Sequence, residues 1–206
     1  MLTNTAASAV ATPSGGVTTL FVDSIDKSRK ARNDAGYVNS YQNAVSLTSQ
    51  AISAASRTYI IGTNIKVSTN KLQAGSMFRW TFTMTKTAAG VAASTFDICV
   101  GTNGTTADTA RVSFTKPAGT AAVDEARVTI IATVRSIGAA GVMVGNFRME
   151  HNGNTVGHAT IPCPVVTTVS AGFDMTVANL NVGLCLTSGA ADAITIQLVQ
   201  AEWWDV

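Results

Sequence analysis

Apolar and polar residues alternate along most of the chain from residue 59 to the C-terminus. A period of two residues is the pattern of a β-strand with one buried face. Short turns that often contain glycine separate these segments, and no apolar pattern of helical length lies between them, which argues against a parallel α/β fold. We therefore predict an all-β domain of about eight or nine strands, folded as a jelly-roll-like β-sandwich. The clearest strand covers residues 78–85, whose apolar face holds Phe78, Trp80, Phe82 and Met84.

Composition divides the chain into three regions. Residues 1–17 are small and polar and are predicted to form a flexible arm. This arm lacks the basic segment and apolar core of a secretory signal, and the chain has no run of about 18 apolar residues that would cross a membrane. Residues 18–57 hold a small β unit and a linker, and residues 58–206 form the β-sandwich domain.

The small β unit is predicted from strand and turn residues. Strand-like segments at 18–22 and 28–32 are followed by turn residues, and a third strand starts at residue 37. Residues 42–57 are predicted to form the linker. So small a unit is not stable alone, so we expect it to pack on something and to serve for attachment.

The low charge of the chain excludes several classes of protein. Charged residues make up 13% of the chain and the net charge is +2, whereas a typical domain has roughly 25% charged residues. This composition argues against a helical bundle, a coiled coil, and a nucleic-acid partner held by high positive charge. It also indicates that other chains cover part of the surface.

The three cysteines show no pattern of a disulfide framework or a metal site. Cys99, Cys163 and Cys185 are odd in number and none has Cys-x-x-Cys spacing. Each lies among apolar neighbours, so we interpret them as buried, reduced thiols. Folding in a reducing cytosol follows from this interpretation.

No arrangement of residues indicates catalysis. The Gly-x-Ser-x-Gly, Walker A, dinucleotide-binding and His-Glu-x-x-His motifs are absent. His151 and His158, with Glu150, could hold a metal, but two loop or cross-strand histidines are the simpler interpretation. We expect no enzyme, no cofactor, and no catalytic or metal-binding residue. A paired-carboxylate site would draw on few acids, of which three fall in predicted loops: Asp108, Asp124 and Glu125.

Two local features have competing interpretations. Residues 27–32, with the sequence KSRKAR, could contact nucleic acid or an acidic surface, but without interleaved aromatic residues we favour a solvated hairpin. Trp203 and Trp204 are adjacent near the C-terminus, where chains are usually polar. One would enter the core of the domain and the other would be covered by a neighbouring chain, or else the linker caps them within the same chain.

Seven segments made of turn and strand motifs carry a resemblance to known proteins: GVTTLFVDS (16–24), DAGYV (34–38), LQAGSMFRW (72–80), TKTAAG (85–90), VGTNGTTADTAR (100–111), SAGFD (170–174) and VQAE (199–202). Together they resemble the β-sandwich structural proteins of tailed-bacteriophage virions, of the capsid-decoration, head-fibre and tail-fibre type. The resemblance spans most of the chain. The resemblance indicates that the protein belongs to a virion, and it says less about where in the virion the protein is located.

The resemblance implies a non-enzymatic assembly protein, made in the host bacterial cytoplasm and located in the virion. We expect a capsid cement or decoration protein that docks through its N-terminal region on the major capsid protein or another virion protein. Its sandwich is expected to form a homotrimer, without membrane or nucleic-acid partners. The alternatives are a tail-fibre or collar appendage that binds a host-surface glycan, and a hydrolase of surface polysaccharide. The candidate attachment and oligomer contacts are Leu20, Phe21, Tyr37, Trp203 and Trp204.

Overall fold

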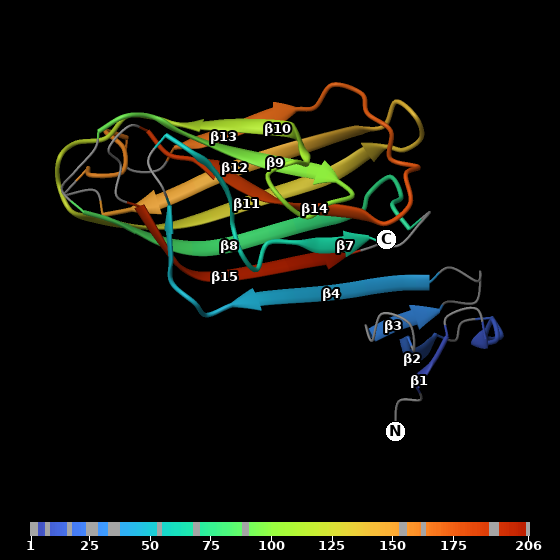
Figure 1. Ribbon diagram of the computed structural model, residues 1–206. Helices are drawn as coiled ribbons and strands as arrows, with labels where there is room; N and C mark the ends of the chain where they lie inside the picture. The colour runs from blue at the N-terminus through green and yellow to red at the C-terminus, as the bar shows by residue number, and fades with distance from the viewer. Residues whose placement is uncertain are drawn as a thin grey trace.

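Two β-sheets pack face to face, and a small β unit precedes them at the N-terminal side (Figure 1). This arrangement confirms the predicted all-β, jelly-roll-like sandwich. In the part of the chain that is described, no helix is long and apolar enough to cross a membrane. The structure, a computed structural model, describes residues 4–6, 9–15, 18–23, 29–32, 38–52, 55–67, 71–87, 91–152, 156–161, 164–189 and 194–204.

The large sheet has ten strands in the order β1-β2-β3-β4-β15-β8-β11-β12-β13, with β5 beside β15. All of its pairs are antiparallel except β1 with β2. Its strands are β1 (Asn4–Thr5), β2 (Thr19–Asp23), β3 (Arg29–Arg32), β4 (Val38–Ser46), β5 (Gln50–Ile52), β8 (Met77–Lys86), β11 (Asp124–Ser136), β12 (Val142–His151), β13 (Val165–Val169) and β15 (Ile194–Trp204).

The small sheet has five strands in the order β10-β9-β14-β6, with β7 beside β14. The chain passes repeatedly between the sheets, from β8 to β9 and β10, back to β11, and again from β13 through β14 to β15, which makes the path jelly-roll-like. The strands of this sheet are β6 (Arg57–Tyr59), β7 (Ile65–Val67), β9 (Ser94–Gly101), β10 (Thr109–Lys116) and β14 (Leu180–Thr187).

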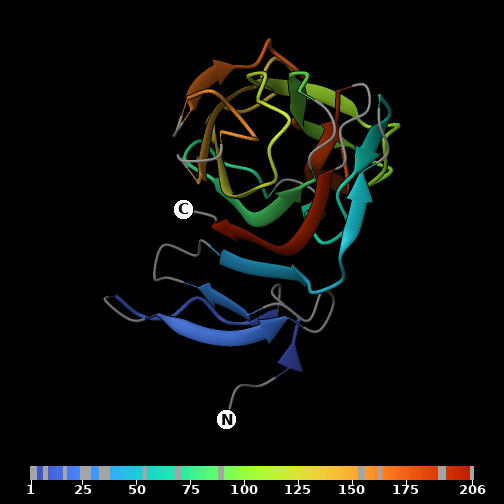
Figure 2. The ribbon, with the colours of Figure 1, turned by 90° about the vertical axis from the view of Figure 1, so that its left-hand side faces the viewer.

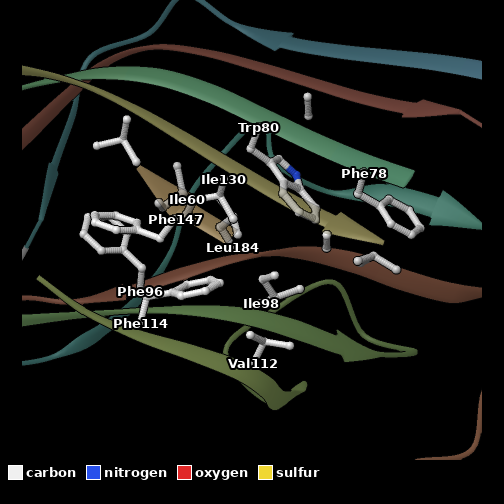
Figure 3. Packing of buried hydrophobic residues seen from close by; sticks show 14 of the residues in the cluster. Ile60, Phe78, Trp80, Phe96, Ile98, Val112, Phe114, Ile130, Phe147 and Leu184 are labelled. Atoms are coloured by element: carbon white, nitrogen blue, oxygen red, sulfur yellow. The ribbon is translucent and has the colours of Figure 1, made fainter. Parts of the chain in front are cut away.

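The core lies between the two sheets and is filled from alternate positions of their strands (Figure 3). The four apolar residues of the predicted strand at 78–85 are fully buried, as expected. The ring centroid of Phe96 lies 5.8 Å from that of Phe82 and 5.3 Å from that of Phe147, so aromatic side chains join the sheets. Gly145 leaves room for this packing, because a Cβ there would lie 2.6 Å from the Phe114 ring.

β15 changes phase within its length. Ile196 points into the core, but the register against β8 shifts between Ile196 and Leu198. A β-bulge sets two residues against one on the partner strand, so the inward positions move to the opposite parity. Val199 and Trp203 are therefore buried, whereas Leu198, which has the same parity as Ile196, is only half-buried.

The prediction of a linker at 42–57 is wrong over most of its length. Residues 41–46 of β4 pair with β15, and β5 pairs with the start of β15. Ile52 of β5 is buried in the core of the sandwich. The alternation in this segment is weak, so its strands depend on a partner far along the chain. The sandwich therefore begins before residue 58.

The N-terminal β unit extends the large sheet beyond the sandwich (Figures 1 and 2). β4 belongs to both parts, because its residues 38–41 pair with β3 and its residues 41–46 pair with β15. The strands predicted in this unit are confirmed as β2, β3 and β4. Part of the predicted flexible arm is also ordered, since β1 pairs with β2.

Candidate functional site

A shallow groove of about 610 Å³ lies on the outer face of the large sheet, over β8, β11, β12 and β15. Alternation along these strands turns apolar side chains into the core and polar ones toward solvent. The result is a surface of hydroxyl, amide and charged groups. Its polar lining includes Thr83, Thr85, Glu125, Arg127, Glu150 and Gln197.

Strand register places these side chains next to one another. Thr85 lies opposite Glu125, and Thr83 lies opposite Arg127, across β8 and β11. Arg127 in turn lies opposite Glu150 across β11 and β12. Threonine residues and charged residues of both signs are therefore neighbours along this groove. The outward threonines can be read from the sequence, but their neighbours depend on pairing between distant strands.

Hydrogen bonds hold two of the lining groups in place. The Gln197 Nε2 donates to Thr85 Oγ1 at 3.2 Å, and Ser49 Oγ donates to Gln197 Oε1 at 2.7 Å. Glu150 forms an ion pair of 2.6 Å with Arg148. A groove of this composition can hydrogen-bond the hydroxyl or amide groups of a polar ligand.

At one end of the groove, His151 is held by contacts on both ring nitrogens. Its Nδ1 lies 2.9 Å from Asp124 Oδ2, and its Nε2 lies 2.8 Å from the carbonyl oxygen of Ile161. The same carboxylate oxygen accepts a hydrogen bond of 2.9 Å from the backbone N–H of His158. Asp124 is thus no loop acid as predicted, but a buried residue at the start of β11 that ties three segments together.

The side chain of His158 is fully buried, and neither ring nitrogen has a hydrogen-bond partner. Burial lowers the pKa of His158 to about 4, so the ring is neutral at pH 7. Among the described residues, no group of three or more His, Cys, Asp or Glu is arranged to hold a metal ion. The contacts of His151 and His158 place both residues in the internal packing of this end of the sandwich.

Two buried lysines hold the loops near this cluster. Lys86 Nζ donates to the carbonyl oxygen of Thr120 at 2.8 Å, and Lys116 Nζ donates to the carbonyl oxygen of His158 at 2.6 Å. Both side chains are almost inaccessible to solvent. Each lysine continues the inward parity of its strand, so the alternation of residues places it on the core side. The loops that accept its hydrogen bonds come from distant parts of the chain.

A second, smaller pocket of about 220 Å³ lies beside the turn that follows β9. Asp108 holds this turn, because its carboxylate accepts hydrogen bonds from the backbone N–H groups of Asn103 at 3.0 Å and Gly104 at 2.7 Å. Gly104 in this turn has a positive φ of 66°, a conformation that favours glycine. The Arg111 guanidinium lies 4.7 Å from the centroid of the Phe173 ring in the same pocket.

The candidate contact residues fall into exposed and internal positions. Leu20 on β2 is 64% exposed, whereas its neighbour Phe21 is buried. Trp203 is buried in the sandwich core and stacks on Phe78, with ring centroids 6.1 Å apart. Trp204 is half-buried on the other face of β15. In the single chain, Leu20 is therefore available for contacts with another molecule, Trp204 is partly covered by the Arg79 guanidinium, and Tyr37 lies outside the described residues.

The basic cluster at 27–32 does not behave as a fully solvated hairpin. Lys30 is buried, and a guanidinium nitrogen of Arg32 donates to the carbonyl oxygen of Val10. At these two positions of β3 the basic side chains pack within the N-terminal unit. This arrangement corrects the expectation of a solvated face there.

No family model and no curated protein matches the sequence. Solved structures give only weak likenesses at about the same level. A protein of unknown function from Shewanella oneidensis MR-1 has a TM-score of 0.39 and 10% identity over 81% of this chain and 87% of its own. Arcelin-5, a lectin-like defense protein from Phaseolus vulgaris, has a TM-score of 0.37 and 8% identity over 82% and 99%. The CBM2 module of the evolved Dit of Lactobacillus casei BL23 phage J-1 has a TM-score of 0.31 and 10% identity over 69% of each chain. At such TM-scores these likenesses carry no argument about function.

Proposed function

We propose that the protein is a structural component of a bacteriophage virion, and specifically a capsid cement or decoration protein. The observation that carries this proposal is the projection of the N-terminal unit from the sandwich along the large sheet (Figure 1). This unit offers a surface for attachment apart from the sandwich, and it exposes Leu20. The resemblance of the sequence to virion proteins points to the major capsid protein or another virion protein as the partner.

The sandwich is proposed to form the oligomer, a homotrimer. β13 ends the large sheet and exposes Val165 and Val169, by 58% and 48%. An edge strand with exposed apolar side chains favours contact with another chain. A trimer around a local symmetry axis would stabilise a capsid by mass action.

Immunogold electron microscopy of the parent virions tests the assignment. An antibody against this chain should label the capsid surface. Label confined to the tail would favour the second candidate below, and virions without label would overturn both. Light scattering coupled to size exclusion should give the mass of a trimer for the purified chain, and a monomer at micromolar concentration would contradict self-association through the sandwich alone.

A matched pair of substitutions tests the attachment surface. Leu20→Asp puts a charge on the exposed face of β2 and should abolish rebinding of the purified chain to virions from which it has been stripped. Leu47→Asp is the control, because Leu47 is 79% exposed but follows β4 next to the sandwich. Equal rebinding by both variants would place the attachment surface elsewhere.

The second candidate is a tail-fibre or collar appendage that recognises a host-surface glycan. The polar groove on the large sheet favours it, because hydroxyl, amide and charged groups suit hydrogen bonding to sugars. A glycan array would test it with the Arg127→Ala variant, which removes a charge from the groove. Arg135→Ala on the same strand, outside the groove, is the control. An array with no binding by the unsubstituted chain would eliminate this candidate.

A further inference from the structure

Two cysteines face each other on the outer side of the small sheet. Cys99 on β9 and Cys185 on β14 are both fully buried, as predicted, and are free thiols. Their sulfur atoms lie 2.7 Å apart. Two thiols in ordinary van der Waals contact lie farther apart than this, and a disulfide needs about 2.05 Å. Cys163 lies outside the described residues.

The strand register explains why the thiols meet. Cys99 pairs with Gly183, and Cys185 pairs with Asp97, so the two cysteines are diagonal neighbours on the same face of the sheet. Gly183 has no side chain to separate them. Tyr59 covers this position, since a Cβ at Gly183 would lie 2.0 Å from the Tyr59 hydroxyl oxygen. The pair is thus enclosed outside the hydrophobic core, under a tyrosine from β6.

Arg57 brings a positive charge to the thiols. Its Nη2 donates to Cys99 Sγ at 3.0 Å, and its Nε lies 3.3 Å from Asp97 Oδ2. Its Nη1 donates to the carbonyl oxygens of Thr106 at 2.9 Å and Asp108 at 3.2 Å. The ion pair and the hydrogen bonds together fix the Arg57 guanidinium group beside the Cys99 sulfur.

These contacts make the two thiols unequal. The hydrogen bond from the Cys99 thiol, together with the charge of Arg57, lowers the pKa of Cys185. The hydrogen bond to Cys185 and burial raise the pKa of Cys99. A thiolate is the nucleophilic form of cysteine, so Cys185 is the thiol prepared to react first.

We propose that Cys99 and Cys185 form a redox-active pair that a peroxide converts into a disulfide between β9 and β14. The Cys185 thiolate attacks one oxygen of hydrogen peroxide, the O–O bond breaks, and the leaving hydroxide takes up the proton lost by the thiol. The product is a sulfenic acid and one water. The Cys99 sulfur then attacks the Cys185 sulfur, the S–O bond breaks, and the hydroxyl leaves as a second water with the Cys99 proton. Two electrons pass from the two sulfurs to the peroxide, and the sulfurs move from 2.7 Å to bonding distance.

Access to the site suits a small oxidant. Neither cysteine is exposed, but the side chain of Arg57 is 29% exposed and reaches Cys99. Hydrogen peroxide is close to water in size, whereas alkylating reagents and glutathione disulfide are much larger. We therefore expect peroxide to react with the folded protein faster than a bulky maleimide does.

Disulfide mapping of the unsubstituted protein tests the proposal without any variant. The folded, reduced chain is treated with hydrogen peroxide, quenched, alkylated in denaturant and digested. We expect a peptide that links Cys99 to Cys185, lighter by two hydrogens than its parts, which dithiothreitol separates, while Cys163 is alkylated. Three alkylated cysteines, a linkage through Cys163, or oxidation to sulfinic acid without a linkage would each overturn the proposal.

A conservative pair of substitutions tests the role of Arg57. Arg57→Lys keeps the charge but loses the planar group that bonds sulfur, the Asp97 carboxylate and two carbonyl oxygens at once. We expect slower formation of the disulfide and a rate–pH profile displaced to higher pH. Arg135→Lys is the control, because Arg135 is exposed on β11 of the other sheet. An Arg57→Lys profile identical to that of the control would show that Arg57 does not activate the pair.

Discussion

Several charged side chains in this protein are buried and hydrogen-bond to backbone groups of the loops. Lys86 and Lys116 are buried and donate to loop carbonyl oxygens, and Asp124 accepts from the N–H of His158. Charged residues make up only 13% of the chain. Each of these contacts satisfies a backbone group in a loop that has no hydrogen-bond partner from strand pairing. A buried charge is expensive unless it is paired in this way, so these residues are sensitive to substitution.

The buried ring of His158 predicts a loss of stability in mild acid. Its pKa is lowered to about 4 in the folded chain and is about 6.5 in the unfolded chain, so the unfolded state binds the proton more tightly. The free energy of unfolding is therefore highest above pH ~6.5. It should fall by about 3 kcal/mol as the pH drops to 4, and this contribution should level off below that.

Urea denaturation at pH 7, 5.5 and 4 measures this effect. The His158→Gln variant is the comparison, because it lacks the titrating ring while the other acids and bases remain. The difference in unfolding free energy between the two proteins should change over this pH range. A difference that stays constant would contradict the assignment of the acid sensitivity to His158.

At the scale of elements, β15 decides how the C-terminal part of the chain packs. It pairs with β8 on one side and with β4 and β5 on the other. Its bulge reverses which residues face the core, so that Trp203 enters it and Trp204 does not. The sequence predicts that the two tryptophans face opposite ways, but which of them is internal depends on the position of the bulge.

The tryptophan pair therefore predicts unequal losses of stability. Trp203→Ala should lower the free energy of unfolding by about 3–5 kcal/mol, because it leaves a cavity beside Phe78. Trp204→Ala should lower it by only about 1 kcal/mol, the order of its contact with Arg79, whose guanidinium lies 4.9 Å from the ring centroid. Urea denaturation of both variants gives the comparison. Equal losses would mean that the bulge lies elsewhere in β15.

At the scale of the whole molecule, one strand joins two parts that differ in packing. The hydrophobic core of the sandwich draws on residues from 44 onward, while β1, β2 and β3 add hydrogen-bonded strands beyond it. Because β4 pairs with both parts, the N-terminal unit is an extension of the large sheet. Attachment through this extension would leave the faces of the sandwich available for other contacts.

This arrangement predicts that the sandwich survives loss of the N-terminal unit. Deletion of residues 1–37 keeps the whole of β4 and all residues of the sandwich core, so thermal unfolding should remain cooperative, with a midpoint within a few degrees of the full chain. Deletion of residues 1–47 also removes β4 and exposes the edge of β15, so it should lower the midpoint and promote aggregation. Circular dichroism during heating compares the two, and a noncooperative transition after the shorter deletion would refute the division.

The sequence by itself determined the strands and the face that each buries, because a period of two residues reflects local backbone geometry. Residues 78–85 and the turn at Asn103 and Gly104 are examples. The tertiary structure decided what depends on register between distant segments. Most of the predicted linker forms strands of the large sheet, and the bulge in β15 reverses which of its residues face the core. Pairing between distant strands also determines the burial of His158 and the set of residues that line the groove. The tertiary structure also brought Cys99 and Cys185 together although 86 positions separate them. The reason is that the spacing of residues along the chain does not indicate which distant strands will pair by hydrogen bonds.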